Sequence, residues 1–298
     1  MKSVLVAMLG GCFLCLAPWF SPRPNFTAPR PVQEKTHASP RWAPSNVDAP
    51  IASLSQTPPC ALEDVLAQAA VHAVELVTNL QNFTARERIR YEVLDDFNNP
   101  QESQTGVFDY LVFIKESRPG TLLVTETRNG KNAFDAYSGR ISDSGLPAMA
   151  LIFHPYYSGE YDMRCEGLGD WKGRTAWVVH FVQRRDRPSR IRAFQTSDAD
   201  YPAKLKGRAW IAADSYQILH LETNLIEGVP RIHLRGEGVS IDYAPVQFKT
   251  RPVTLWLPES AEVYSDFGDL RYHVEHSFSN FLIFSVDVKE NDEAPRKP

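Results

Sequence analysis

The chain has 298 residues, which is enough for one large all-β domain or two small ones with a sizeable core. Hydrophobic residues make up 43% and charged residues 23%, as in an ordinary soluble globular protein. The net charge of −4 has the wrong sign for binding nucleic acid by neutralising phosphates, so no nucleic-acid partner is expected.

Residues 1–22 are predicted to be a secretory signal or an N-terminal anchor. Lys2 precedes an apolar run that is short for a spanning helix and is interrupted by Gly10 and Gly11. The sequence around Cys12 resembles a lipoprotein processing box, with Cys12 as the lipidated residue. Signal cleavage, lipidation at Cys12 and an uncleaved anchor therefore remain alternatives. All three predict an exported protein of the periplasm or cell envelope, free or membrane-tethered.

Residues 23–59 combine a scatter of prolines with Ser, Thr, Ala and Asn and little apolar content. Such a segment cannot bury enough surface to offset its ordering entropy, so we expect a disordered tether. Residues 290–298 are expected to form a disordered tail for the same reason. The folded domain is then predicted to span residues 60–289.

Of the four cysteines, Cys12 and Cys15 lie in the predicted signal, which leaves Cys60 and Cys165. Two cysteines in an exported protein most often pair, so a Cys60–Cys165 disulfide is predicted. Neither has a second cysteine or a histidine at ligand spacing, and no metal or cofactor is expected.

The folded part begins with a predicted amphipathic helix over residues 62–80, where apolar residues recur at spacings of three and four. From Thr84 the period changes to two, which indicates strands. Asn129-Gly130 predicts a hairpin that joins residues 122–128 to residues 131–137. A short apolar helix over residues 146–153 interrupts the strands and is expected to plug or cap the interior.

The hairpin over residues 204–225, around a turn at Asp214 and Ser215, has one apolar and one polar face in its second run. A sheet of this kind needs an apolar cover on its inner side. Further turns are predicted at Ala244-Pro245 and Gly268-Asp269. The expected fold class is mainly β (α+β), with about a dozen antiparallel strands, one long helix and one short helix.

Five arginines lie between residues 183 and 192. The run is either a solvated loop or a contact with anionic headgroups or an acidic envelope protein. Its members are Arg184, Arg185, Arg187, Arg190 and Arg192.

The sequence contains no recognisable catalytic motif of the serine-hydrolase, zinc-protease or Walker type. Glu222, Glu237 and Glu262 could supply a carboxylate pair, but no pattern brings two of them together. The protein is therefore expected not to be an enzyme.

Four short motifs stand out: residues 79–85 at the end of the first helix, the 169–174 turn, the 209–214 hairpin and residues 256–260. Together they resemble the LolA-like superfamily of outer-membrane lipoprotein-sorting and periplasmic lipid-binding proteins. The resemblance implies a curved antiparallel half-barrel whose helices close over an apolar cavity that binds lipid or the acyl chains of lipoproteins, without catalytic residues.

Three hypotheses follow: a lipid or lipoprotein carrier, an envelope interaction or sensor module of the same fold, and an envelope hydrolase with an unrecognised site. The sequence leaves the cargo and the oligomeric state undetermined. The apolar cavity is expected to be lined by large residues of the strands and the plug helix, namely Tyr110, Phe113, Met149, Phe153, Phe181, Trp210, Leu221, Trp256 and Tyr264.

Overall fold

The computed structural model describes residues 43–79, 82–129, 145–146, 148–196, 199–248 and 252–284. The chain divides into two compact units, residues 1–39 and 40–298, and all the described residues belong to the second. The predictions for residues 1–22, 23–42 and 290–298 lie outside the described residues.

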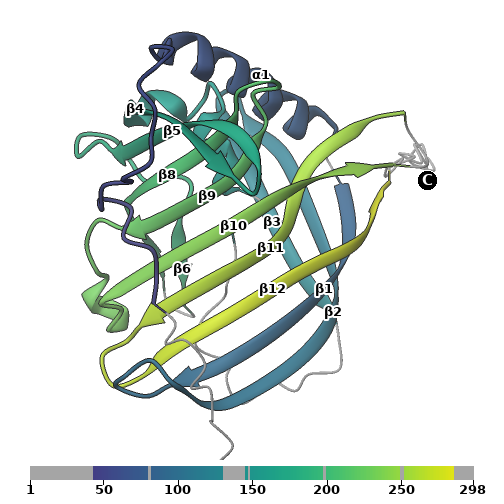
Figure 1. The fold of residues 1–298 in the computed structure, drawn as a ribbon. Coiled ribbons are helices and arrows are strands. Elements are labelled where there is room, and N and C mark those ends of the chain that lie inside the picture. Colours follow the sequence, from purple (N-terminus) through teal and green to yellow (C-terminus); the bar gives the residue numbers. More distant parts are fainter. Residues whose placement is uncertain are drawn as a thin grey trace, which may run out of the picture. The chain divides into compact units, whose positions relative to one another are not determined.

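Ten antiparallel strands form one curved sheet in the order β3-β2-β1-β12-β11-β10-β9-β8-β5-β4 (Figure 1). Among the described residues its two end strands, β3 and β4, do not pair with each other, so the sheet is an open half-barrel. Its strands are β1 (Asn82–Leu94), β2 (Pro100–Arg118), β3 (Thr121–Asn129), β4 (Tyr161–Trp171), β5 (Arg174–Gln183), β8 (Leu205–Ala212), β9 (Ile218–Leu225), β10 (Gly236–Gln247), β11 (Thr254–Asp266) and β12 (Arg271–Ile283).

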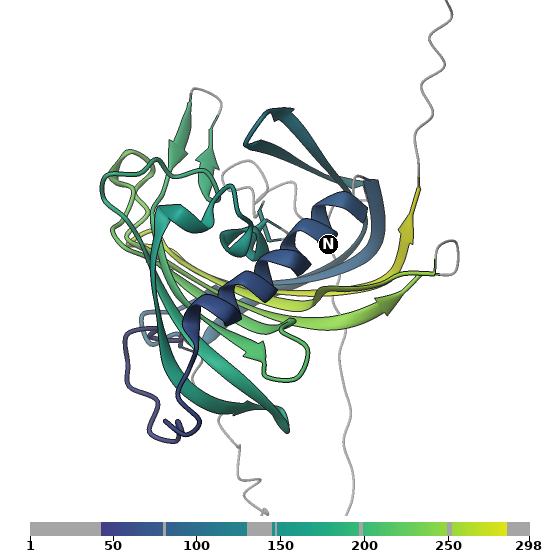
Figure 2. The same cartoon turned by 90° about the horizontal axis from the view of Figure 1, so that it is seen from above.

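The helix α1 (Leu62–Asn79) lies across the concave side of the sheet (Figure 2). A separate small hairpin pairs β6 (Ala193–Gln195) with β7 (Asp200–Pro202). Three short 3₁₀ helices complete the described elements: η1 (Met149–Phe153), η2 (Ser158–Glu160) and η3 (Pro230–Ile232). The expected mainly β half-barrel with an N-terminal amphipathic helix is therefore confirmed.

The core lies between the concave face of the sheet and the two elements that cover it. The helix α1 buries Val65, Ala69, Ala73 and Leu76, which recur at spacings of three and four and so share one face. All five residues of η1 are buried in the same cluster. The short apolar helix predicted between the strands therefore forms as a 3₁₀ helix, and it fills the interior of the half-barrel.

The turn expected at Ala244-Pro245 is wrong, because β10 continues through it and pairs Pro245 with Trp256. Proline lacks the N–H that a central strand must donate, and is tolerated where one side of the strand has no partner. Strand β9 pairs with β10 only from Gly238 to Asp242, so Pro245 lies beyond that pairing. The hairpin predicted at Asn129-Gly130 has its second strand outside the described residues.

Residues 43–59 form a segment that lies against the convex face of the sheet, and we call it the N-terminal strap. The expectation of a disordered tether is wrong over this stretch. Val47 is fully buried, and Ser55 and Leu168 exchange two backbone hydrogen bonds of 2.7 and 2.8 Å. Ile51 and Leu54 pack on a small apolar cluster of the convex face. The composition of the segment does not predict this order, because its few apolar residues are buried against apolar residues that are far away in the sequence.

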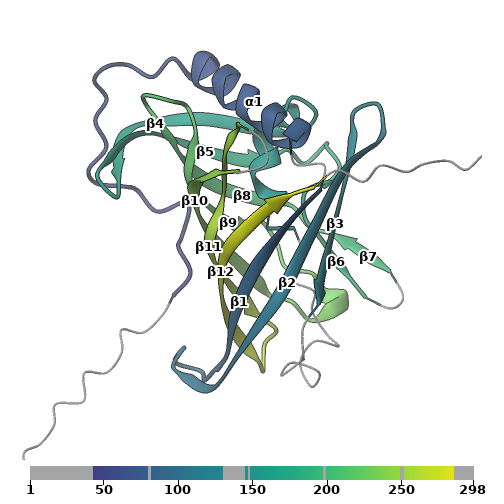
Figure 3. The same ribbon diagram turned by 90° about the vertical axis from the view of Figure 1, so that its right-hand side faces the viewer.

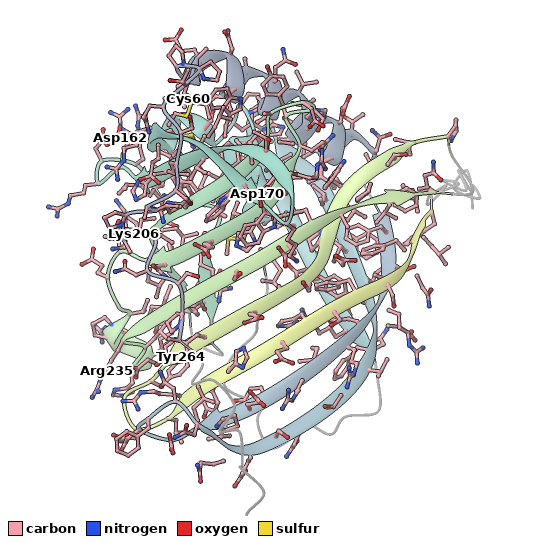
Figure 4. All side chains as sticks on the ribbon, in the orientation of Figure 1. Cys60, Asp162, Asp170, Lys206, Arg235 and Tyr264 are labelled. Carbon is pink, nitrogen blue, oxygen red and sulfur yellow. A yellow bond between two sulfur atoms is a disulfide. The ribbon has the colours of Figure 1, made fainter. Side chains whose placement is uncertain are left out.

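A disulfide joins Cys60 to Cys165, as the sequence predicts, with the two Cα atoms 6.3 Å apart. It ties the start of α1 to β4, beside the point where the strap pairs with that edge strand (Figure 4). The cross-link spans 105 residues, so it removes a large amount of chain entropy from the unfolded state.

Replacing both cysteines (Cys60→Ser with Cys165→Ser) should lower the free energy of unfolding by about 3 to 5 kcal/mol, because the cross-link no longer restricts the unfolded chain. Urea unfolding of the oxidised wild type and the double variant measures the difference. The wild type treated with reductant serves as the matched control and should unfold like the variant. Equal midpoints for all three samples would contradict the prediction.

Candidate ligand-binding groove

Five of the predicted cavity residues lie on the concave side and are packed into the core. Tyr110, Met149, Phe153, Phe181 and Leu221 are all at most 1% exposed. The rings of Phe153 and Phe181 meet edge to face, with their centroids 6.1 Å apart. These side chains therefore fill the deep interior among themselves.

Trp210 and Tyr264 were expected on the concave side, and the structure places both on the convex face. Ala209 pairs with Leu221, and both belong to the concave-side core, so the next residue, Trp210, points the other way. Trp210 packs against Trp171, with the ring centroids 5.1 Å apart, in the apolar cluster that the strap covers. Tyr264 follows the core residue Val263 and points outward by the same alternation.

Trp256 lies between the two apolar clusters, partly buried and in contact with both. The guanidinium of Arg174 lies 5.1 Å from the centre of its ring. Phe113 is also partly buried, with its ring 6.3 Å from that of Phe284, and it lines the groove described next.

A groove of about 650 Å³ opens at the end of the half-barrel where β1 begins. Asn82 at the start of β1 pairs with Phe113, so among the described residues β2 has no β1 neighbour from Ile114 onward. The β2–β3 hairpin thus extends past β1, beside the C-terminal end of α1 (Figure 3). The groove between them is lined by Val74, Val77, Thr78, Phe113, Ile114, Lys115, Glu116, Leu122, His154 and Tyr156.

Hydrogen bonds hold the β2–β3 hairpin against the segment that follows η1. The hydroxyl of Tyr156 donates to Glu116 Oε1 at 2.9 Å, and the backbone N–H of Gly120 donates to the same oxygen at 3.1 Å. The N–H of Leu122 donates to the hydroxyl of Tyr157 at 2.9 Å. One wall of the groove is therefore fixed by polar contacts, while its lining combines apolar and polar side chains.

His154 lies in the groove as a neutral side chain. Burial lowers the pKa of its imidazole, although the Glu116 carboxylate acts in the opposite direction. Its Nδ1 faces the backbone N–H of Tyr156 at 3.2 Å and so accepts a hydrogen bond. The proton of the neutral ring is then on Nε2.

Exposed apolar side chains surround the groove. Val74 and Tyr156 are each 40% exposed, Leu123 is 55% exposed and Leu282 is 61% exposed. Leu123 pairs with Lys115, and Leu282 pairs with Thr84 near the start of β1, so both lie at the groove end of the sheet. Apolar surface gathered around an opening is typical of a ligand or membrane contact.

Sequence analysis missed a buried polar network on the concave face. Glu87 is fully buried and accepts two hydrogen bonds from Arg128, at 2.6 and 3.0 Å. His276 Nδ1 lies 2.8 Å from the same carboxylate. Tyr110 donates to Glu126 at 2.7 Å beside this group. The available signal was Glu87 itself, a charge at an inward position of an alternating strand.

The protonation of this network follows from its contacts. Burial acts to raise the pKa of Glu87, but hydrogen bonds from His276 and Arg128 outweigh it and hold the pKa below its ordinary value. Burial raises the pKa of Glu126 despite the nearby guanidinium of Arg128. Glu87 and Arg128 therefore form a buried ion pair whose members depend on each other.

A second polar cluster lies on the convex face under the strap. His220 Nδ1 is 2.9 Å from Asp242, and Trp171 stacks on the imidazole with ring centroids 3.6 Å apart. Ser45 of the strap donates to Glu222 at 2.6 Å, so its hydroxyl is engaged by a carboxylate and not by His220. A serine nucleophile would have to hydrogen-bond to the histidine. This cluster fastens the strap and is not arranged for nucleophilic attack.

Glu92, His273 and Glu275 each place one possible metal-ligand atom within 4.8 Å of the others. Arg90 already contacts both carboxylates, at 2.6 Å from Glu92 and 3.5 Å from Glu275. Its guanidinium supplies the positive charge that a metal would bring, so these residues do not fit a metal site.

The five arginines of residues 184–192 do not form one exposed surface. Arg192 is buried and paired with Glu237, and Arg190 forms an ion pair of 2.5 Å with Glu160. Arg185 and Arg187 are exposed, and Arg184 is partly exposed beside Asp186. The expected headgroup or partner contact through all five is wrong for Arg192, because its charge is neutralised inside the protein.

No family model matches the chain, and no curated protein matches it. Solved structures with a similar fold include a DUF1329 family protein from Desulfovibrio piger, with a TM-score of 0.44 and 10% identity over 74% of this chain and 92% of that one. A domain from Vibrio parahaemolyticus, described as a putative outer membrane lipoprotein-sorting protein domain, has a TM-score of 0.40 and 13% identity. The match covers 77% of this chain and 96% of that one. A LolA superfamily protein from Nitrosomonas europaea has a TM-score of 0.36 and 9% identity, and the match covers 76% of this chain and 94% of that one.

In the part of the chain that the structure describes, no helix is both long and apolar enough to cross a membrane.

Replacing Glu87 with glutamine should lower the free energy of unfolding by about 2 to 4 kcal/mol, because the guanidinium of Arg128 is left buried without its counter-charge. Urea unfolding measures the change. Glu259→Gln, at an exposed position of β11, is the matched control and should stay within about 0.5 kcal/mol of the wild type. Equal losses in the two variants would show that the ion pair is not the cause.

Acid should weaken the convex-face cluster through Asp242. Burial acts to raise its pKa, but hydrogen bonds from His220 and Lys172 lower it from 3.8 to about 2. As the pH falls from 3.8 toward about 2, Asp242 takes up a proton in the unfolded protein before it does so in the folded protein. The free energy of unfolding therefore falls over this pH range. The wild type should lose about 1 to 2 kcal/mol more than Asp242→Asn, after allowance for solvent screening. Urea unfolding of both proteins at several pH values in this range tests the prediction. If the free energy of unfolding falls equally with pH in the wild type and in Asp242→Asn, the prediction is wrong.

Proposed function

We propose that the protein is a non-enzymatic binding or carrier protein of the cell envelope, which holds an acyl chain of a lipid or lipoprotein in the groove between α1 and the β2–β3 hairpin. The observation that carries the proposal is a groove of about 650 Å³ at the end of the half-barrel, with apolar side chains from α1, β2 and β3 in its lining. Ligand sites typically enclose about 300 to 1,000 Å³ and are lined mainly by apolar side chains. The domain over residues 60–289 is thus proposed as a lipid-binding domain.

The energetics favour an acyl chain over a compact polar ligand. Each methylene buried in the groove gains about 0.8 kcal/mol, so several methylenes offset the cost of association. The polar atoms of Tyr156, Gly120 and Leu122 are bonded within the protein, so they need no ligand to satisfy them. The N-terminal signal or anchor predicted over residues 1–22 supports a location in the periplasm or envelope.

An envelope interaction module is a second candidate function, favoured by the exposed side chains of Leu123 and Leu282 outside the groove. Exposed apolar residues that gather at one end of a protein also suit a protein or membrane contact. In this case the rim, and not the groove, would be the functional surface, and the two candidates differ in where substitutions act.

Val74→Glu should weaken the binding of a fluorescent fatty-acid probe at least tenfold, because an acyl chain in the groove would have to desolvate the new carboxylate. Val71→Glu is the matched control. Val71 is the same residue on the same helix and is 49% exposed against 40% for Val74, but it does not line the groove. Fluorescence titration measures both affinities.

A wild-type protein that does not bind the probe saturably would remove the carrier proposal. Equal weakening by Val74→Glu and Val71→Glu would move the site from the groove to the general apolar surface of α1. That second result would favour the interaction module.

A further inference from the structure

The lining of the groove carries two opposite charges that the described structure leaves without ion-pair partners. Lys115 and Glu116 are consecutive residues of β2, and neither forms a salt bridge within the described ranges. By contrast, Arg190, which donates to the Gly120 carbonyl at the tip of the β2–β3 hairpin, is neutralised by Glu160. The pair Lys115 and Glu116 is therefore the electrostatic feature of the groove.

The carboxylate of Glu116 is held in place without being neutralised. Its Oε1 accepts hydrogen bonds from the Tyr156 hydroxyl and the Gly120 N–H, and both donors are uncharged. These two bonds orient the side chain at the wall of the groove and leave its negative charge available. A carboxylate fixed in this way suits a cationic hydrogen-bond donor of a ligand.

Lys115 can reach the same groove although neighbouring residues of a strand point to opposite faces. Beyond Phe113 the described part of β2 has no β1 neighbour, so the groove crosses a free strand edge. Residues of both faces line it there, including Phe113 and Lys115 from one face and Ile114 and Glu116 from the other. One residue that carries an ammonium and one that carries a carboxylate therefore line the same opening.

The remaining polar groups of the lining carry no charge. His154 is a neutral ring whose Nδ1 already accepts a hydrogen bond. The hydroxyl of Thr78 donates to the Val74 carbonyl at 2.8 Å, within α1. The charge pattern of the groove is thus one positive and one negative residue among the apolar side chains of its lining.

We propose that the groove selects acyl ligands with a zwitterionic headgroup, whose ammonium pairs with Glu116 and whose phosphate pairs with Lys115. A phosphoethanolamine headgroup has this chemistry. The inference rests on the proposed function, since it concerns the ligand of the same groove. An anionic headgroup such as phosphoglycerol would pair its phosphate with Lys115 and leave the Glu116 carboxylate without a counter-charge.

The expected selectivity is modest, because both side chains are exposed to solvent and exposed ion pairs are weak. A charge-assisted hydrogen bond between the ligand ammonium and Glu116 should favour the zwitterionic lipid by about three- to tenfold.

The test compares lysophosphatidylethanolamine with lysophosphatidylglycerol of the same acyl chain, each below its micellar concentration, by isothermal titration calorimetry on the full chain. The wild type should bind the ethanolamine lipid about three- to tenfold more tightly. Glu116→Gln keeps an acceptor for Tyr156 and Gly120 but removes the charge, and it should abolish the preference. Lys115→Gln should weaken both lipids alike. Glu259→Gln, an exposed glutamate outside the groove lining, should keep the preference.

The outcomes separate the two proposals. Equal binding of both lipids by the wild type, or a preference that survives in Glu116→Gln, would overturn the headgroup inference and leave acyl-chain binding intact. Failure of the wild type to bind either lipid would overturn both. Thermal melts of Glu116→Gln and Glu259→Gln check that neither substitution acts by unfolding the protein.

Discussion

The structure depends on one constraint, which is that a curved sheet with an apolar concave face must be covered. The helix α1 supplies one apolar stripe, and η1 brings five buried residues into the space beneath it. Together they remove the concave face from water, which is the main favourable term in folding a sheet of this kind. The disulfide and the strap then attach the start of α1 to the edge strand β4, so the cover is held at its N-terminal end.

The groove lies where this cover ends. Helix α1 stops at Asn79 and β1 begins at Asn82, while β2 continues to Arg118 and turns into β3. The end of the β2–β3 hairpin therefore extends past β1, and no described strand pairs with β2 on that side. Polar contacts from Tyr156 and Tyr157 keep the hairpin in position, so the apolar surface at this end is preserved and not collapsed. A packed interior with a groove at its open end is the arrangement that suits a ligand held near the surface.

Buried ionisable side chains on both faces of the sheet have partners of opposite charge. Glu87 with Arg128 on the concave side, and His220 with Asp242 on the convex side, meet the rule that buried charges must be paired. Such pairs add little net stability over apolar residues but are costly to break. They fix which strands meet, because a shifted register would leave a charge without its counter-ion.

The sequence by itself determined what depends on neighbours along the chain: the amphipathic stripe of α1, the alternation in the strands, the turn at Asp214 and Ser215, and the pairing of the two cysteines left outside the signal. The tertiary structure decided what depends on residues far apart. Ser45 and Val47 lie in a proline-rich stretch that composition predicts to be disordered, yet they bond to Glu222 and Asn224 of β9. Trp210 faces outward because Ala209 meets Leu221 across the strands. Glu116 lines a groove only because β1 begins too late to cover the end of β2. Local periodicity sets which residues share a face, but only long-range pairing sets what each face meets.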